Sequence, residues 1–170
     1  MRSIFLLLIL STHMFCKTLK MNKKSEKSIE ISILDLKNLS KNECLNVKTL
    51  FLFDSVKVAI SPDVINYNII EREVIYNQEM SNLKYFKNLK YLYFVNIYMT
   101  DIHKDILSLE NLEELQFNFL NQEISENQVS KFLKLKKLKK LIINNFFIGD
   151  ANFNLVKKFL SKSKIKVESS

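Results

Sequence analysis

The chain has 170 residues, of which 47% are hydrophobic, and its 26 basic and 18 acidic side chains give a net charge of +8. This length and apolar content predict one domain with a hydrophobic core. A single glycine and two cysteines are too few to build a phosphate-binding glycine loop, a nucleophile elbow or a paired-cysteine zinc site. We therefore expect no catalytic site, no metal and no cofactor.

The first 15 residues have the order of charge and hydropathy found in a secretory signal peptide. Arg2 precedes an apolar run over residues 4–10, which is shorter than the about 20 residues that a membrane span requires. We therefore expect export. Cys16 stands where a bacterial lipoprotein carries its lipid-modified cysteine, and this N-terminus resembles the looser lipoprotein signals of spirochaetes. Cleavage of an ordinary signal peptide beyond Cys16, or a retained anchor, is the alternative.

The first predicted elements lie in residues 29–52. Residues 29–33 alternate isoleucine with polar residues and predict an opening strand. Residues 44–52 then follow the pattern Cys44-x-x-Val47-x-x-Leu50-x-Leu52. In this pattern Cys44 takes a buried position, where a free cysteine behaves as a small apolar residue. A disulfide between Cys16 and Cys44 is the alternative.

Five apolar positions recur with the same spacing in three later stretches. They are Leu83-x-x-Phe86-x-x-Leu89-x-x-Leu92-x-Phe94, Ile106-x-x-Leu109-x-x-Leu112-x-x-Leu115-x-Phe117 and Phe132-x-x-Leu135-x-x-Leu138-x-x-Leu141-x-Ile143. The leucines that begin the last part of each stretch, Leu92, Leu115 and Leu141, are 23 and 26 residues apart. A spacing of three that tightens to two predicts a turn that enters a short strand and repeats. An amphipathic helix is the alternative, but this series drifts around a 3.6-residue helix.

Two weaker units complete the series. The 42 residues from Leu50 to Leu92 leave room for one degenerate repeat, with a strand near residues 74–76. Residues 159–167 follow the same spacing and place Ile165 24 residues beyond Leu141. We expect a closing strand there.

These repeats resemble the leucine-rich-repeat family over residues 41–167, most clearly over residues 83–147. The resemblance implies an α/β solenoid, in which about five to seven short strands form a curved parallel sheet with a helical or irregular convex side. Residues 29–170 would form this domain, after a signal peptide over residues 1–15 and a linker over residues 16–28.

The chain departs from the family at one position. The family places an asparagine five residues after the leucine that begins each strand, and its side chain links successive turns. The corresponding residues here are Ser55, Ile97, Leu120 and Phe146. Asparagines occur nearby but out of register, at Asn96, Asn118, Asn121, Asn144 and Asn145. We therefore expect the asparagine ladder to be missing.

The resemblance also implies a binding surface, because strand side chains beside the buried positions would point into the concave face of the sheet. The outward residues would be Thr49, Phe51, Phe53, Tyr91, Tyr93, Val95, Glu114, Gln116, Asn118, Lys140, Ile142 and Asn144. Exposed aromatic clusters often mark protein-binding surfaces. We expect a protein partner to contact Phe51, Phe53, Tyr91, Tyr93, Gln116, Asn118 and Ile142. The alternative is that the N-terminal region covers Phe51 and Phe53 as a cap.

Lysines are concentrated in the last two repeats. Six lie within ten residues, at Lys131, Lys134, Lys136, Lys137, Lys139 and Lys140, and five follow at Lys157, Lys158, Lys162, Lys164 and Lys166. Such a basic patch would suit an anionic membrane, lipopolysaccharide or a sulfated glycan, and a simply solvated face is the alternative. The sequence contains no aromatic–basic nucleic-acid module, so we do not expect a nucleic acid partner.

Beyond the leader the sequence has one histidine, His103, between Asp101 and Asp105. We expect it in a solvated loop rather than in an acid–base or metal site. The sequence thus favours an exported, non-catalytic protein-binding module, either secreted or held by lipid at the cell envelope, on the outer surface or in the periplasm. The alternative is a lipid-anchored structural protein of the envelope that uses its lysines to contact an anionic membrane or glycan.

Overall fold

The computed structural model describes residues 27–54, 76–119, 123–144 and 148–170. Within them six strands form one parallel sheet in the order β1-β2-β3-β4-β5-β6. The strands are β1 (Lys27–Ser32), β2 (Val47–Phe53), β3 (Tyr91–Val95), β4 (Glu114–Phe117), β5 (Lys140–Ile143) and β6 (Lys166–Ser169). The α/β class and the parallel sheet predicted from the repeats are confirmed.

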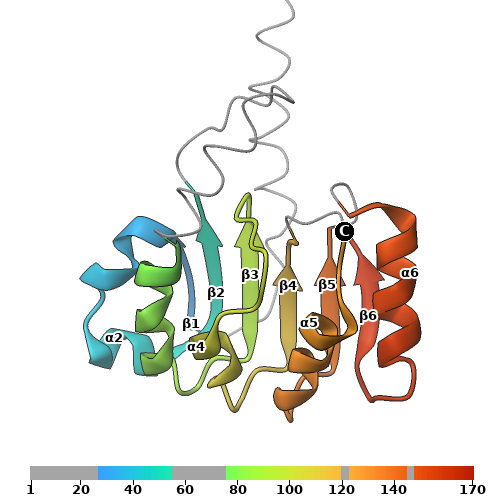
Figure 1. The fold of residues 1–170 in the computed structure, drawn as a ribbon. Coiled ribbons are helices and arrows are strands. Elements are labelled where there is room, and N and C mark those ends of the chain that lie inside the picture. Colours follow the sequence, from blue (N-terminus) through green and yellow to red (C-terminus); the bar gives the residue numbers. More distant parts are fainter. Residues whose placement is uncertain (1–26, 55–75, 120–122, 145–147) are drawn as a thin grey trace, which may run out of the picture.

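Helical segments connect the strands, because parallel neighbours need a crossover that returns the chain to the same edge of the sheet. They are the 3₁₀ helices η1 (Ile33–Asn38), η2 (Met80–Tyr85) and η3 (Lys131–Lys134) and the α-helices α2 (Lys41–Leu45), α4 (Lys104–Leu107), α5 (Glu126–Ser130) and α6 (Gly149–Leu160). Figure 1 shows α4 and α5 in front of the sheet, α2 beside β1 and α6 beside β6. The short helices α2 and α5 each begin with a capping box, from Ser40 with Glu43 and from Ser125 with Gln128.

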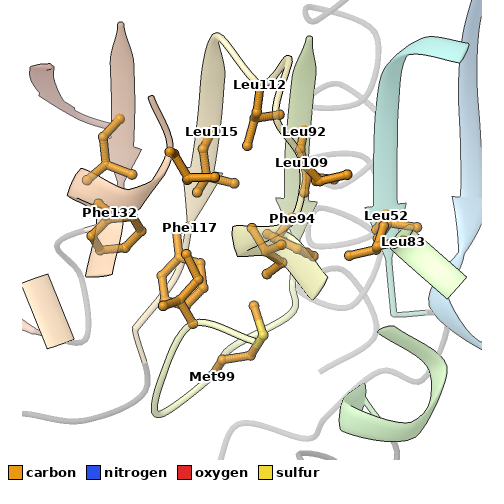
Figure 2. Packing of buried hydrophobic residues seen from close by; sticks show 14 of the residues in the cluster. Leu52, Leu83, Leu92, Phe94, Met99, Leu109, Leu112, Leu115, Phe117 and Phe132 are labelled. Carbon is orange, nitrogen blue, oxygen red and sulfur yellow. The ribbon is translucent and has the colours of Figure 1, made fainter. Parts of the chain in front are cut away.

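The hydrophobic core lies between the sheet and these helices. Every apolar position of the three predicted stretches is buried, with at most 4% of each residue exposed. Strand register brings Leu50, Leu92, Leu115 and Leu141 side by side across the sheet, and Figure 2 shows Leu92 and Leu115 in this packing. Burying one large apolar side chain contributes about 1.5–3 kcal/mol, so the repeated leucines account for much of the stability of the stack.

Phenylalanines fill the core beside the central strands. Phe117 meets Phe119 at 4.8 Å and Phe132 at 5.6 Å between ring centroids, both edge to face. Figure 2 shows Phe117 between Phe94 of the neighbouring strand and Phe132. Edge-to-face contacts add about 0.5–1.5 kcal/mol to the effect of burial alone. These rings therefore fix how the helical layer sits on β3 and β4.

The outer repeats agree with the sequence in most respects. Residues 29–33 lie mainly in β1, and Cys44 is buried and unpaired. The predicted closing strand is β6, but its predicted register is wrong by two residues, because Val167 and not Ile165 pairs with Leu141. The strand expected near residues 74–76 falls largely outside the described residues. Its described residue, Tyr76, is helical, and β2 pairs directly with β3. The described part of this segment therefore places no strand between them.

Candidate binding face

Alternation along the strands places a second set of side chains on the face opposite the core. We call this the aromatic–charged face, and it consists of Thr49, Phe51, Phe53, Tyr91, Tyr93, Val95, Glu114, Gln116, Lys140, Ile142, Lys166 and Glu168. Most of these side chains are half-buried, Lys166 is exposed and Tyr93 is buried with 8% exposed. A half-buried row of this kind is held by its neighbours and still offers surface to a partner.

The strand register aligns this face in rows that run across the sheet. One row contains Thr49, Tyr91, Glu114, Lys140 and Lys166. The next contains Phe51, Tyr93, Gln116, Ile142 and Glu168. Side chains directly opposite on neighbouring strands are about 4.5–5.5 Å apart at Cβ, so members of one row can touch. The rows divide the face into an aromatic half on β2 and β3 and a charged half on β4, β5 and β6.

The aromatic half is organised around Tyr93. Its ring stacks on Phe51 with centroids 4.8 Å apart and planes 14° from parallel. The Tyr93 hydroxyl donates a hydrogen bond of 2.9 Å to Oε1 of Glu114. Burial, and then this hydrogen bond to a carboxylate, raises the pKa of Tyr93 well above its usual range. The tyrosine is therefore held neutral and in one orientation.

Ion pairs continue from Glu114 across the charged half. The ammonium of Lys140 lies 3.7 Å from Glu114 and 2.9 Å from Glu168, and Lys166 lies 2.8 Å from Glu168. The bond to Glu168 raises the pKa of Lys140, and the bonds from Lys166 and then Lys140 lower the pKa of Glu168. A continuous chain of contacts thus runs from Phe51 on β2 to Lys166 on β6.

Gln116 and Ile142 complete the predicted set between the two halves. The amide of Gln116 donates to the carbonyl oxygen of Phe94 at 3.1 Å, so one of its polar groups is already used. Ile142 is half-buried in the same row. Phe51, Phe53 and Tyr91 are half-buried as well. The structure therefore brings six of the seven predicted binding residues onto one face, as the spacing of the repeats requires.

Asn118 is the exception, and the prediction that it points outward is wrong. Only 2% of it is exposed, and its amide nitrogen donates to the carbonyl oxygens of Phe94 at 2.9 Å and Ile97 at 3.0 Å. The strand β4 ends at Phe117, so the alternation that places side chains outward no longer applies one residue later. Asn118 instead links its turn to the preceding one, although it lies two residues before the position that the family's ladder uses.

The predicted basic patch divides into paired and unpaired lysines. Lys131 forms an ion pair with Asp101, and Lys139 forms one with Glu113 at 2.7 Å, which lowers the pKa of that carboxyl. Lys140 belongs to the aromatic–charged face. The others, Lys134, Lys136 and Lys137, are exposed and line a surface hollow with Leu107, Leu109 and Glu110. The positive charge available to a partner is therefore smaller and more localised than the sequence suggests.

His103 lies in the loop directly before α4, where we expected a loop residue. The expectation that it is solvated is wrong, because only 12% of its side chain is exposed. Its Nδ1 accepts a hydrogen bond of 3.2 Å from the backbone N–H of Asp105 and so caps the helix. The acceptor role requires a neutral imidazole. Burial lowers the pKa of His103, although the carboxylate of Asp105 opposes this. Its position indicates a structural role.

The comparisons assign no family and no relative. No protein-family model matches the chain, and no curated protein matches it. Among the described residues no group of three or more His, Cys, Asp or Glu side chains could hold a metal ion. In the same ranges no helix is both long and apolar enough to cross a membrane. The signal peptide over residues 1–15 and the lipid site at Cys16 lie outside the described residues and stay predictions.

The ion pairs of β6 are the part of the face that sequence reasoning missed. Lys166 and Glu168 were not among the predicted outward residues, although their spacing of two in a terminal strand is the signal that would have found them. Their pairing with Lys140 depends on the register of β5 and β6. That register becomes visible only when the strands are placed.

Proposed function

We propose that this chain is a small leucine-rich-repeat solenoid that binds a protein partner through the aromatic–charged face, without catalysis. The observation that supports it best is the unbroken series of contacts from the Phe51–Tyr93 stack to the Lys140–Glu168 ion pair. This series orders aromatic, apolar and charged groups in fixed positions over five strands. Aromatic residues are enriched in protein-binding surfaces, and polar groups surround them as a rim.

Support for the solenoid comes from the periodic alignment of the strands. Leu92, Leu115, Leu141 and Val167 are in register, and their spacings of 23, 26 and 26 residues fall in the range of leucine-rich repeats. Backbone N–H groups at the strand starts donate to the preceding turn, from Glu113 to Lys90 at 2.8 Å and from Lys139 to Glu113 at 2.8 Å. Each turn therefore contacts its neighbour in the same way, as stacked repeats do.

The mechanism of binding would be the presentation of a rigid surface. Ordering a flexible side chain at an interface costs about 0.5–1.5 kcal/mol. Tyr93, Glu114 and Lys140 are already held by contacts within the sheet, so a partner would order them at little cost. The Tyr91 ring and the Ile142 side chain, both half-buried, would supply the apolar contact area.

Site-specific photo-crosslinking would test this proposal. Benzoylphenylalanine at position 91, in the aromatic row, should form an adduct with one protein from an envelope extract, identified by mass spectrometry. The same reagent at position 154, an exposed site on α6, should not form that adduct. The proposal fails if both positions give the same adducts or if position 91 gives none.

Competition would show whether the whole face takes part. Unlabelled wild-type chain should suppress the adduct at position 91, whereas an Ile142→Arg chain should not, because the bulky charge would disrupt the apolar centre of the face. Circular dichroism would confirm that Ile142→Arg is folded. Equal competition by the two chains would limit the site to β2 and β3 and contradict a face-wide surface.

A further inference from the structure

The turns that precede the strands form a second surface with a different composition. All strands of the sheet run in the same direction (Figure 1), so the starts of β2 to β6 lie along one edge. The strand register aligns Thr49, Tyr91, Glu114, Lys140 and Lys166 across the sheet. The residue four positions before each of them lies in the turn that leads into the strand, so these five residues are equivalent. We call Leu45, Lys87, Glu110, Lys136 and Lys162 the strand-start row.

Side-chain hydrogen bonds hold neighbouring turns of this edge together. The amide of Asn88 donates to the carbonyl oxygen of Leu45 at 2.9 Å, and the amide of Asn111 donates to that of Lys87 at 2.8 Å. Lys137 occupies the position of Asn88 and Asn111 in the next turn, and its ammonium donates to Oδ1 of Asn111 at 2.6 Å. The strand-start row is therefore a built feature of the stack rather than a set of separate loops.

The charge of this edge is positive and largely unneutralised. Lys87, Lys136 and Lys162 are exposed and have no ionic partner among the described residues, and the same holds for Lys134 and Lys164 beside them. Two acidic residues lie in the turns that carry these lysines. Glu113 pairs with Lys139 and Lys90. Glu110 is exposed in the same region and shares a surface hollow with Lys134, Lys136 and Lys137. On the aromatic–charged face, by contrast, Lys140 and Lys166 both meet the carboxylate of Glu168.

Exposed leucines accompany these lysines. Leu45, with 40% exposed, belongs to the strand-start row, and Leu133, with 47% exposed, lies in η3 three residues before Lys136. They are the large apolar residues that stand out as exposed in the described part of the chain. Basic residues mixed with protruding apolar ones are the composition of surfaces that bind the headgroup layer of a membrane.

We propose that the strand-start edge binds an anionic phospholipid surface. Its lysines would face the phosphate groups, and Leu45 and Leu133 would enter the layer between headgroups and acyl chains. Neighbouring turns are about 5 Å apart, so the five positions of the row span about 20 Å, which suits a flat ligand. The leucines favour a lipid surface over a sulfated glycan, because a glycan offers them no apolar contact.

Vesicle sedimentation of the full chain would test this inference. The wild-type chain should bind vesicles of phosphatidylglycerol and phosphatidylcholine and should bind pure phosphatidylcholine only weakly. Each lysine near an anionic surface contributes about fivefold to binding, so Lys136→Gln with Lys162→Gln should weaken binding by about 30-fold. Raising the salt concentration should also weaken binding, because screening shortens the reach of the charges.

A control variant with the same net charge distinguishes the effect of lysines at this edge from the effect of the total charge of the chain. Ala151→Glu with Asn154→Glu also lowers the net charge by two, by adding two negative charges, but both sites are exposed on the first half of α6. This control should bind like the wild-type chain to within about threefold. Equal losses in the two double variants would overturn the proposal, as would wild-type binding that does not distinguish the two vesicle types.

The substitution Leu133→Ser distinguishes lipid binding from glycan binding. This substitution at a half-exposed site should weaken vesicle binding severalfold and leave the retention of the chain on immobilised heparin unchanged. Retention on heparin without vesicle binding would identify the edge as a glycan site and overturn the lipid assignment. None of these residues belongs to the aromatic–charged face, so the crosslinking experiment and this one fail independently.

Discussion

Asn118 should stabilise the stack through the two carbonyl groups that its buried amide contacts. In Asn118→Ala the carbonyl oxygen of Ile97 loses its side-chain donor, whereas that of Phe94 keeps the amide of Gln116. An orphaned buried carbonyl costs about 1–3 kcal/mol, and the second lost bond costs about 0.5–1.5 kcal/mol. Oδ1 of Asn118 is itself buried without a partner, so removing it returns about 1 kcal/mol. The net loss should be about 1–3 kcal/mol.

Urea denaturation followed by circular dichroism would measure this loss. With a slope of about 2 kcal/mol per molar urea, the midpoint should fall by about 0.5–1.5 M at unchanged slope. Asn118→Asp should cost more, because a buried carboxylate would lie against two carbonyl oxygens and could donate to neither. Asn154→Ala, at an exposed site on α6, is the matched control and should change stability by less than about 0.5 kcal/mol. A similarly small effect of Asn118→Ala would refute the proposed link between turns.

Three further substitutions test the described contacts. Tyr93→Phe should cost about 1–2 kcal/mol by urea denaturation, because the hydrogen bond to the Glu114 carboxylate is lost; an unchanged midpoint would contradict that bond. Because burial lowers the pKa of His103 below its ordinary value of 6.5, its stabilising contribution should be complete above about pH 6.5 and be lost as the pH falls through the folded-state pKa. Relative to His103→Asn, which caps without titrating, the wild-type chain should therefore lose stability as the pH falls below about 6.5, and parallel curves would refute this. Ser125→Ala should cost about 1 kcal/mol by removing the capping box of α5, whereas Ser161→Ala, just beyond α6, should cost less.

The buried half of the fold could be predicted from the sequence. Leu92, Leu115 and Leu141 are in register because the spacing of apolar residues alone determines which face of a strand is buried. The same alternation assigned Phe51 and Tyr91 to the opposite face. Short strands limit this reasoning. The strand β4 has four residues, so a predicted strand end that is one residue too late assigns Asn118 to the surface although it is buried.

The pairing of charges could not be predicted in the same way. Lys131 meets Asp101, 30 residues earlier, and Lys140 meets Glu168 on the neighbouring strand. A run of lysines in a sequence shows only how much positive charge is present. Whether a carboxylate neutralises each lysine depends on which turn lies next to it, and that follows from the stacking of the repeats. Lys137 has no ionic partner in the described part of the chain because the neighbouring turn presents the neutral amide of Asn111 to it.

The two proposed surfaces are oriented so that both can be used together. Side chains of the aromatic–charged face stand roughly perpendicular to the sheet, whereas the turns of the strand-start row lie at the edge where the parallel strands begin (Figure 1). A chain resting on a membrane by that edge would therefore keep its aromatic–charged face upright and accessible. The crosslink from position 91 should then form equally well on anionic vesicles and in solution. Suppression of the adduct by vesicles that bind the wild-type chain would show instead that lipid and partner compete for overlapping surfaces.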